Sequence, residues 1–223
     1  MTSDRDNSVL QLAGFTTPTI ANAIETFGVR ARDEGFMDHS IGCRFPSLGP
    51  LVGYAATARI RAKGAGPSER PAELWRHVAS LPAPRVVVIE DLDEPPGVGS
   101  FWGEVNANVY RALGCAGVVT NGCVRDLTEM ATLGFQAFSS CICVSHAYVR
   151  LVEVGQPVRV GGLEVRPGDL LHGDRHGVLK VPPGIVAELA EAARGVEAAE
   201  RKLIAFCQSP GFSLEGLDAF ELE

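Results

Sequence analysis

The middle of the chain alternates between two kinds of hydrophobic pattern. Short apolar runs typical of buried strands lie at 51–62, 85–92, 116–119 and 135–144. Apolar residues at helical spacing occur between them, at 71–81, after Glu104 and at 127–134. The run at 85–92 contains Val-Val-Val-Ile, which a parallel strand covered on both faces requires. This alternation predicts an α/β fold with a central, mainly parallel sheet and flanking helices.

The two ends of the chain have different patterns. Thr17–Pro18 predicts an N-cap followed by proline at the first helical position, with Gly28 as the stop. The segment 29–50 is rich in turn residues and is assigned no element. After Val152, short strands separated by glycine turns predict a second, antiparallel β-layer, and a long helix follows from Ile185. We expect residues 1–223 to form one domain, with 1–8 disordered and 184–223 a C-terminal helix and tail.

Charge and composition exclude several classes of function. A formal net charge of −7 and a pI near 5.3 argue against binding to nucleic acid or to anionic membranes. No window approaches the roughly 18–20 uninterrupted apolar residues of a membrane span, and MTSDRDNSV lacks the regions of a signal peptide. The six cysteines form no CxxC pair, so neither a disulfide framework nor a zinc site is expected. We therefore expect a cytoplasmic protein.

Candidate chemistry concentrates in the segment 97–126, GVGSFWGEVNANVYRALGCAGVVTNGCVRD. Glu104 begins a helix after a glycine-rich loop, and Arg125 and Asp126 open the next helix after a short strand. Both turns should emerge at the same edge of a parallel sheet, where ligands bind. Two carboxylates and an arginine beside free helix N–H groups would suit a hard divalent cation and a small carboxylate ligand. Taken alone, the Arg125–Asp126 pair is equally typical of a capping carboxylate and a surface arginine.

The spacing of these residues resembles that of a known family. Glu104, twenty residues and then Arg125–Asp126 is similar to the [D/E]-x20-R-D motif of the RraA-like family, which includes class II 4-hydroxy-4-methyl-2-oxoglutarate aldolases with oxaloacetate decarboxylase as a second activity. The strings WGEVNANVYRALGCAGVVTNGCVRD, GDRHGVLKVP and TPTIANAIETFG extend the resemblance over roughly residues 15–205. It implies a layered β/β/α, swivelling-domain-like fold and a divalent-metal-dependent lyase that cleaves a C–C bond of a 2-oxo acid through a pyruvate enolate.

The resemblance also implies a role for each matching residue. Asp126 would bind Mg²⁺ or Mn²⁺ directly, and Glu104 would bind the cation through water. Arg125 would hold the 2-oxo acid and stabilise the enolate oxygen. Arg125 and Glu104 would be the two catalytic residues. The substrate carboxylate would rest on the turn formed by Gly103, Glu104, Val105 and Asn106. The family assembles as trimers or hexamers, and Glu200 of a neighbouring subunit is the candidate for a further ligand, although a solvated helix face explains Glu200 equally well.

Two departures from the family pattern keep alternatives open. Asn121–Gly122 stands where members commonly have Asp-Gly, and Asn106 replaces an apolar residue in the substrate turn. Both changes are compatible with a lyase that acts on another acid. A different alternative is a non-catalytic regulator that binds a ribonuclease or another protein, although that branch departs from the Arg-Asp pair kept here. The histidines form no ligand pair, and the surface is the expected place for His39 and His176.

Overall fold

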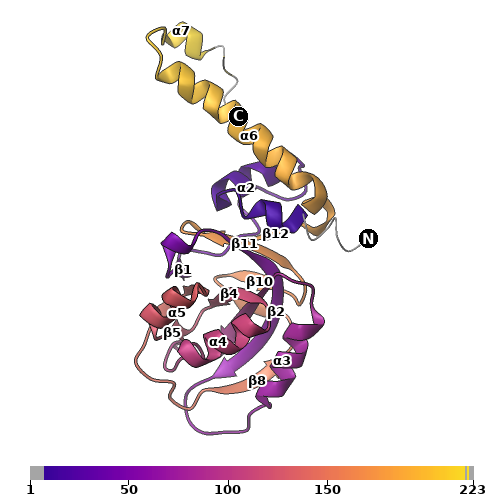
Figure 1. Ribbon diagram of the computed structural model, residues 1–223, viewed down its shortest axis with the longest axis vertical. Coiled ribbons are helices and arrows are strands. Elements are labelled where there is room, and N and C mark those ends of the chain that lie inside the picture. Colours follow the sequence, from indigo (N-terminus) through magenta and orange to yellow (C-terminus); the bar gives the residue numbers. More distant parts are fainter. Residues whose placement is uncertain (1–7, 219, 221–223) are drawn as a thin grey trace.

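A single twisted sheet forms the centre of the computed structural model, which describes residues 8–218 and 220 (Figure 1). Its strands lie in the order β1–β6–β4–β3–β2–β11–β12, and β8 also pairs with β2. Parallel pairing joins β2, β3, β4 and β6, whereas β1, β8, β11 and β12 pair antiparallel with their neighbours. The strands of this sheet are β1 (Gly42–Cys43), β2 (Leu51–Arg61), β3 (Arg85–Asp91), β4 (Cys115–Thr120), β6 (Gln136–Ser139), β8 (Arg150–Val154), β11 (Leu170–Asp174) and β12 (Gly177–Val181).

Three helices cover one face of the parallel strands: α3 (Pro71–Ser80), α4 (Glu104–Ala112) and α5 (Leu127–Leu133) (Figure 1). Successive residues of a strand point to opposite faces, so alternate residues of β2 and β3 meet these helices. Ala56, Ala58, Val87 and Ile89 are fully buried or nearly so in this core. Trp102, just before α4, packs there against Tyr110 and Phe135. The helical core thus fixes the two loops that precede α4 and α5.

The opposite face of the sheet carries a small antiparallel hairpin, β9 (Val158–Val160) and β10 (Leu163–Val165). Its buried valines pack against the other set of strand residues, including Val86, Val88 and Phe138. The predicted α/β fold class is confirmed, with the hairpin as its second β-layer. This layer is smaller than we expected, because β11 and β12 continue the central sheet beyond β2 instead of lying across it.

A third core lies on β11 and β12 and is built from α2 (Thr17–Glu25), the helical residues 8–12 and the start of α6 (Val186–Cys207). Beyond this contact α6 projects away from the body of the molecule (Figure 1). The tail turns back at the far end, where Phe212 and Phe220 pack on Phe206 and α7 (Leu214–Leu217) forms. Short 3-10 turns occur at Pro46–Leu48 and Pro183–Ile185. Among the described residues, no helix has the length and apolar character needed to cross a bilayer.

Several local predictions need correction. The N-cap of α2 is Thr16, whose side chain accepts the N–H of Thr19, so Pro18 stands at the second helical position. The predicted strand 135–144 divides at Ser140 into β6 and β7 (Cys141–Ile142), and β7 leaves the central sheet to pair with β5 (Cys123–Val124). Ser8 is helical, whereas the rest of the segment expected to be disordered, 1–7, lies outside the described residues.

His172 joins the third core to the sheet, and its burial makes the stability of the protein depend on pH. Its ring lies on β11 with no exposed surface; Nε2 is 3.1 Å from the carbonyl oxygen of Leu12, and Nδ1 is 3.0 Å from the hydroxyl of Thr17. Burial lowers the pKa of His172, although the Leu12 carbonyl and the charge of Asp174 oppose this shift. The unfolded chain therefore takes up this proton at a higher pH than the folded chain does.

As the pH is lowered, we expect the free energy of unfolding to begin falling near pH 6.5. It should keep falling until the pH passes below the lowered pKa of folded His172. The loss amounts to about 1.4 kcal/mol for each unit of difference between the two pKa values. Urea unfolding at pH 7.5 and 5.5 measures it. His172→Gln should flatten this slope, whereas His39→Gln, at an exposed position, should leave it unchanged. An identical slope in His172→Gln would refute the assignment.

Candidate functional site

The N-termini of α4 and α5 meet at the carboxyl end of the parallel strands. The backbone N–H of Glu104, the first residue of α4, donates to Oδ2 of Asp126 at 2.9 Å. Asp126 is the N-cap residue of α5 but makes no side-chain cap there. Its carboxylate caps the neighbouring helix α4 instead. The sequence had suggested a metal ligand or a cap of its own helix, and neither interpretation included this contact. The backbone of Glu104 and the side chain of Asp126 therefore lie side by side, so the two turns leave the same edge of the sheet. That both carboxylates point to one site stays a prediction.

The backbone around this contact is arranged for close approach. Asp126 has φ 54° and ψ 48°, a left-handed conformation that aspartate and asparagine adopt more readily than most residues. Gly103 packs so tightly against Asp126 and Arg125 that it has no room for a Cβ. Arg125 donates its backbone N–H to the Trp102 carbonyl at 3.1 Å, and its Nε lies 3.7 Å from Oδ2 of Asp126. Both side chains keep 36% of their surface exposed, so each is accessible to a small ligand.

A cavity of about 200 Å³ opens at this point. Its lining residues come from the loop before α4, the first turn of α4, the start of α5 and the loop after β7: Ser100, Phe101, Gly103, Val105, Asn106, Arg125, Asp126, His146 and Val149. No lysine belongs to this lining, so the cavity offers no amine for Schiff-base chemistry. A larger cavity of about 460 Å³ lies near the start of α6, but its lining includes no arginine, lysine or histidine. We therefore place the candidate site in the smaller cavity.

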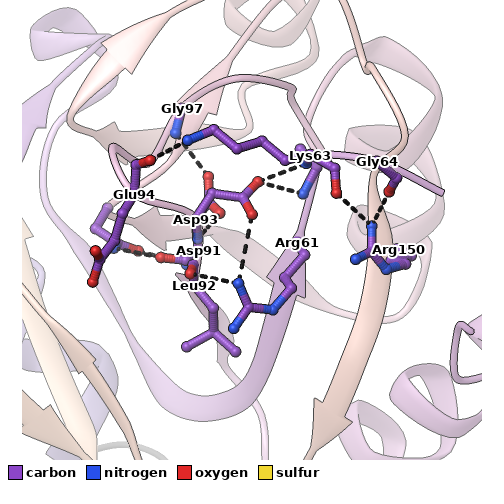
Figure 2. Close-up of polar contacts among 11 residues, drawn as sticks. Arg61, Lys63, Gly64, Asp91, Leu92, Asp93, Glu94, Gly97 and Arg150 are labelled. Atoms are coloured by element: carbon purple, nitrogen blue, oxygen red, sulfur yellow. Dashed lines mark hydrogen bonds and ion pairs between the residues drawn. The ribbon is translucent and has the colours of Figure 1, made fainter. Parts of the chain in front are cut away.

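The loop between β3 and α4 is held by two buried aspartates, shown in Figure 2. Asp91 accepts the N–H groups of Asp93 (3.0 Å) and Gly97 (2.8 Å), and burial raises its pKa. Asp93 accepts the N–H groups of Ala62 (2.6 Å) and Lys63 (2.8 Å) at the end of β2. Lys63 in turn donates to the carbonyl of Glu94. These contacts fix the path by which the chain reaches Gly103.

Asn121 fastens the same loop to the end of β4. Its Oδ1 accepts the N–H of Asp91 at 2.7 Å, and its Nδ2 donates to the Asp91 carbonyl at 3.0 Å. The Asn121 amide satisfies both groups at once, whereas the ionised carboxylate of an aspartate has no hydrogen to donate to the carbonyl. Asparagine in place of the aspartate of the family's Asp-Gly therefore allows position 121 to make both hydrogen bonds to Asp91.

We expect Asn121→Asp to lower the free energy of unfolding by about 1–3 kcal/mol, because it removes one hydrogen bond and sets a carboxylate oxygen against a carbonyl oxygen. Urea denaturation at pH 7 measures the change. Asn108→Asp is the matched control: its Nδ2 also donates to a carbonyl, that of Glu104, but on the exposed side of α4. Equal stability of both variants would show that the two hydrogen bonds between Asn121 and Asp91 contribute nothing to the free energy of unfolding.

The donor set suits a cation that needs few protein ligands. Within the described residues, no group of three or more His, Cys, Asp or Glu side chains is arranged to hold a metal ion. Mg²⁺ commonly binds through one or two carboxylates and fills its other positions with water and substrate oxygens. Asp126 fits that kind of site and does not fit a closed cage of protein ligands, whereas Glu104 is exposed and does not belong to the lining of the cavity. Whether a cation binds stays a prediction.

The structure also shows the surroundings of two further predicted site residues, Asn106 and Glu200. Asn106 donates through Nδ2 to the Phe101 carbonyl at 2.6 Å, which leaves its Oδ1 to meet a ligand. Glu200 lies on the projecting helix α6, where its Oε1 accepts Asn22 Nδ2 of α2 at 3.2 Å. It does not line the cavity of its own chain. Its predicted role in a neighbouring subunit's site stays a prediction.

His146, Ser100, Phe101 and Val149 line the cavity although sequence reasoning did not select them. The signal for His146 was its position shortly after the run at 135–144, since the carboxyl ends of parallel strands share one edge. That signal was weak, because the division of this run into β6 and β7 decides where the following loop goes.

Comparisons with known proteins agree on one family. The model of the family RraA-like, described as Aldolase/RraA, matches residues 17–180. A protein of Halalkalibacterium halodurans, provisionally named a 4-hydroxy-4-methyl-2-oxoglutarate aldolase, is 31% identical over 99 residues, 43% of this chain and 46% of that one. An uncharacterized protein of Methanocaldococcus jannaschii is 30% identical over 120 residues, 53% of this chain and 58% of that one. The chain thus spans about half the length of these relatives.

Solved structures show the same fold. An uncharacterized protein from Pseudomonas syringae pv. tomato has a TM-score of 0.73 at 24% identity, covering 96% of this chain and 97% of that one. RraAS2 of Streptomyces coelicolor, titled an unusual member of the RNase ES inhibitor RraA protein family, has a TM-score of 0.68 at 20% identity, covering 87% and 94%. At these identities the likeness establishes the fold alone.

Proposed function

This chain belongs to the RraA-like family, and from its site we propose that it is a divalent-metal-dependent carbon–carbon lyase acting on a 2-oxo acid. The observation that carries the proposal is the small cavity that Arg125 and Asp126 line with the first turn of α4, whose Glu104 N–H donates to Asp126 at 2.9 Å. The reaction would be a retro-aldol cleavage of 4-hydroxy-4-methyl-2-oxoglutarate type, decarboxylation of oxaloacetate, or both. Either one leaves pyruvate enolate.

The residues of the cavity divide the work between binding and charge stabilisation. The guanidinium of Arg125 would donate to the substrate's oxo group and stabilise the oxygen as negative charge develops there. The N–H groups of Val105 and Asn106 lie in the first turn of α4, where the helix supplies no acceptor, so they are suited to the substrate carboxylate. Asp126 and Glu104 would hold Mg²⁺ or Mn²⁺. When bound, this cation would polarise the oxo group as a Lewis acid.

The test is pyruvate release by the purified protein. We expect turnover of 4-hydroxy-4-methyl-2-oxoglutarate or oxaloacetate with Mg²⁺ or Mn²⁺, and its loss after treatment with EDTA and return on adding the metal. The uncatalysed, metal-promoted loss of CO₂ from oxaloacetate is subtracted in a reaction without protein. No turnover of either substrate with either metal would refute this activity.

The non-catalytic alternative remains an outcome of the same experiments. The likeness to RraAS2 shows the fold alone and so does not favour regulation over catalysis. Absence of turnover, absence of Mn²⁺ binding by calorimetry and co-purification with an endoribonuclease would together favour a regulator.

We also propose that the chain self-associates as a trimer or hexamer. The projecting part of α6 supports this, because only Leu189, Ala190 and Ala193 of the helix are buried and Ile204 is 51% exposed. Assembly would be the only route by which Glu200 reaches a site, since it lies on α6 away from its own cavity. Light scattering of the purified protein measures the assembly, and a strict monomer would exclude the role of Glu200.

A further inference from the structure

His146 lies in the candidate cavity, and one nitrogen of its exposed ring is hydrogen-bonded to the backbone. It belongs to the same lining as Arg125 and Asp126. Its Nδ1 is 2.8 Å from the carbonyl oxygen of Ala147. A carbonyl oxygen can only accept, so Nδ1 carries the hydrogen and Nε2 is the basic nitrogen of the neutral ring. A histidine whose tautomer is set in this way is prepared to take up or release a proton at Nε2.

The segment that carries His146 is held firmly against both sides of the cavity. Ser100 donates its N–H to the Ser145 carbonyl at 2.9 Å, and Cys143 donates its N–H to the Val124 carbonyl at 3.1 Å. Gly99 lies so close to the His146 carbonyl that a Cβ would have no room there. The turn is also conformationally costly, because Ala147 has φ 46°, a left-handed value that residues other than glycine rarely adopt. Strain of this kind persists where the surrounding structure enforces it and is often found at functional sites.

We propose that His146 is the proton carrier of this cavity, an inference that rests on the proposed lyase function. In the retro-aldol reaction Nε2 takes the proton of the C4 hydroxyl as the C3–C4 bond breaks. The electrons of that bond form the C2–C3 enolate of pyruvate, and the carbonyl product leaves. The imidazolium then returns the proton to C3, which gives the methyl group of pyruvate. In oxaloacetate decarboxylation no hydroxyl proton is removed, so Nε2 of His146 first takes up a proton from water and then delivers it to C3 of the enolate that forms as CO₂ leaves.

This difference between the two reactions gives the inference a specific test. We expect His146→Ala to lower kcat for retro-aldol cleavage by about 10²-fold or more, the usual contribution of a general acid–base group, and to slow decarboxylation less. Added imidazole should restore part of the lost activity. The charged side chains that line the cavity together with His146 are Arg125 and Asp126, and both are unchanged in the variant.

Three controls separate proton transfer from other roles. His39→Ala, at an exposed position outside the cavity, should keep full activity and show no response to imidazole. His146→Gln keeps a polar side chain and should show the same loss as His146→Ala. Calorimetry with Mn²⁺ should give the same affinity for wild type and both variants at position 146.

A second assay does not depend on the identity of the aldol substrate. The wild-type protein with Mn²⁺ should exchange the methyl protons of pyruvate for deuterium in D₂O, observed by NMR, and His146→Ala should exchange them at least about tenfold more slowly. Full exchange and turnover by the variant, or a loss of Mn²⁺ affinity equal to the loss of activity, would overturn the role of His146 and leave the lyase proposal intact. A wild-type protein that neither exchanges nor cleaves would refute both.

Discussion

Asp126→Asn is expected to lower kcat/KM for pyruvate release by at least about 10²–10³-fold, which is the size of effect seen when one group that stabilises transition-state charge is lost. Asparagine has nearly the same shape as aspartate and tolerates the left-handed backbone at this position. Its Oδ1 can still accept the N–H of Glu104, so the turn should survive. What the substitution removes is the negative charge that a divalent cation requires.

Two measurements decide whether the loss has this cause. Mn²⁺ affinity measured by calorimetry should fall with activity, and the urea midpoint of unfolding should stay close to that of the wild type. Asp33→Asn, an exposed aspartate in the 29–50 segment, is the matched control and should change neither quantity. Retained activity and metal affinity in Asp126→Asn would place the cation elsewhere or exclude it.

Arg125→Lys is expected to cost about 10²-fold in kcat/KM even though the positive charge remains. A guanidinium presents several donors in a fixed plane and can bind a carboxylate or an enolate oxygen through two of them, whereas an ammonium acts as a point charge. The Nε of Arg125 is also directed toward Asp126 Oδ2 at 3.7 Å, so its remaining donors are those available to a ligand. The larger part of the loss should appear in kcat, because the oxo oxygen gains charge only as the bond breaks.

The comparison variant for this experiment is Arg175→Lys, at an exposed position in the turn between β11 and β12. It should behave as wild type in both activity and stability. A loss confined to KM in Arg125→Lys would mean that Arg125 only binds the substrate, and an unchanged kcat/KM would remove it from the proposed site.

The central sheet could be predicted because its strands are covered on both faces. Such strands read as continuous apolar runs, as 85–92 does, and the helices between them keep their own spacing. The division of 135–144 could not be predicted, since no glycine or proline interrupts the run. It depends on Ser140, whose hydroxyl donates to the carbonyls of Asn121 and Gly122 (2.6 and 3.0 Å), residues that lie far from it in the sequence. Tertiary pairing, which no local pattern encodes, also decided that β11 would join β2.

The candidate site divides in the same way. Glu104 and Asp126 could be paired from the sequence, because each follows a strand of the same parallel sheet. The direction of the Asp126 carboxylate could not, because aspartate at an N-cap ordinarily bonds its own helix. His146 was missed for a related reason: it is placed by the loop after β7, and only the structure shows that this loop lies against Ser100.

The left-handed backbone at Asp126 has a consequence for how such a site can diverge. Three amino acids occupy this conformation at little cost, namely glycine, asparagine and aspartate, and aspartate alone among them carries a charge. A descendant that exchanged it for a residue other than these three would strain the turn and, unless that residue were glutamate, would also lose the anionic group. A stepwise change of chemistry at this position is therefore expected to begin with substitution by asparagine or glycine. Either residue keeps the shape of the turn and removes the negative charge.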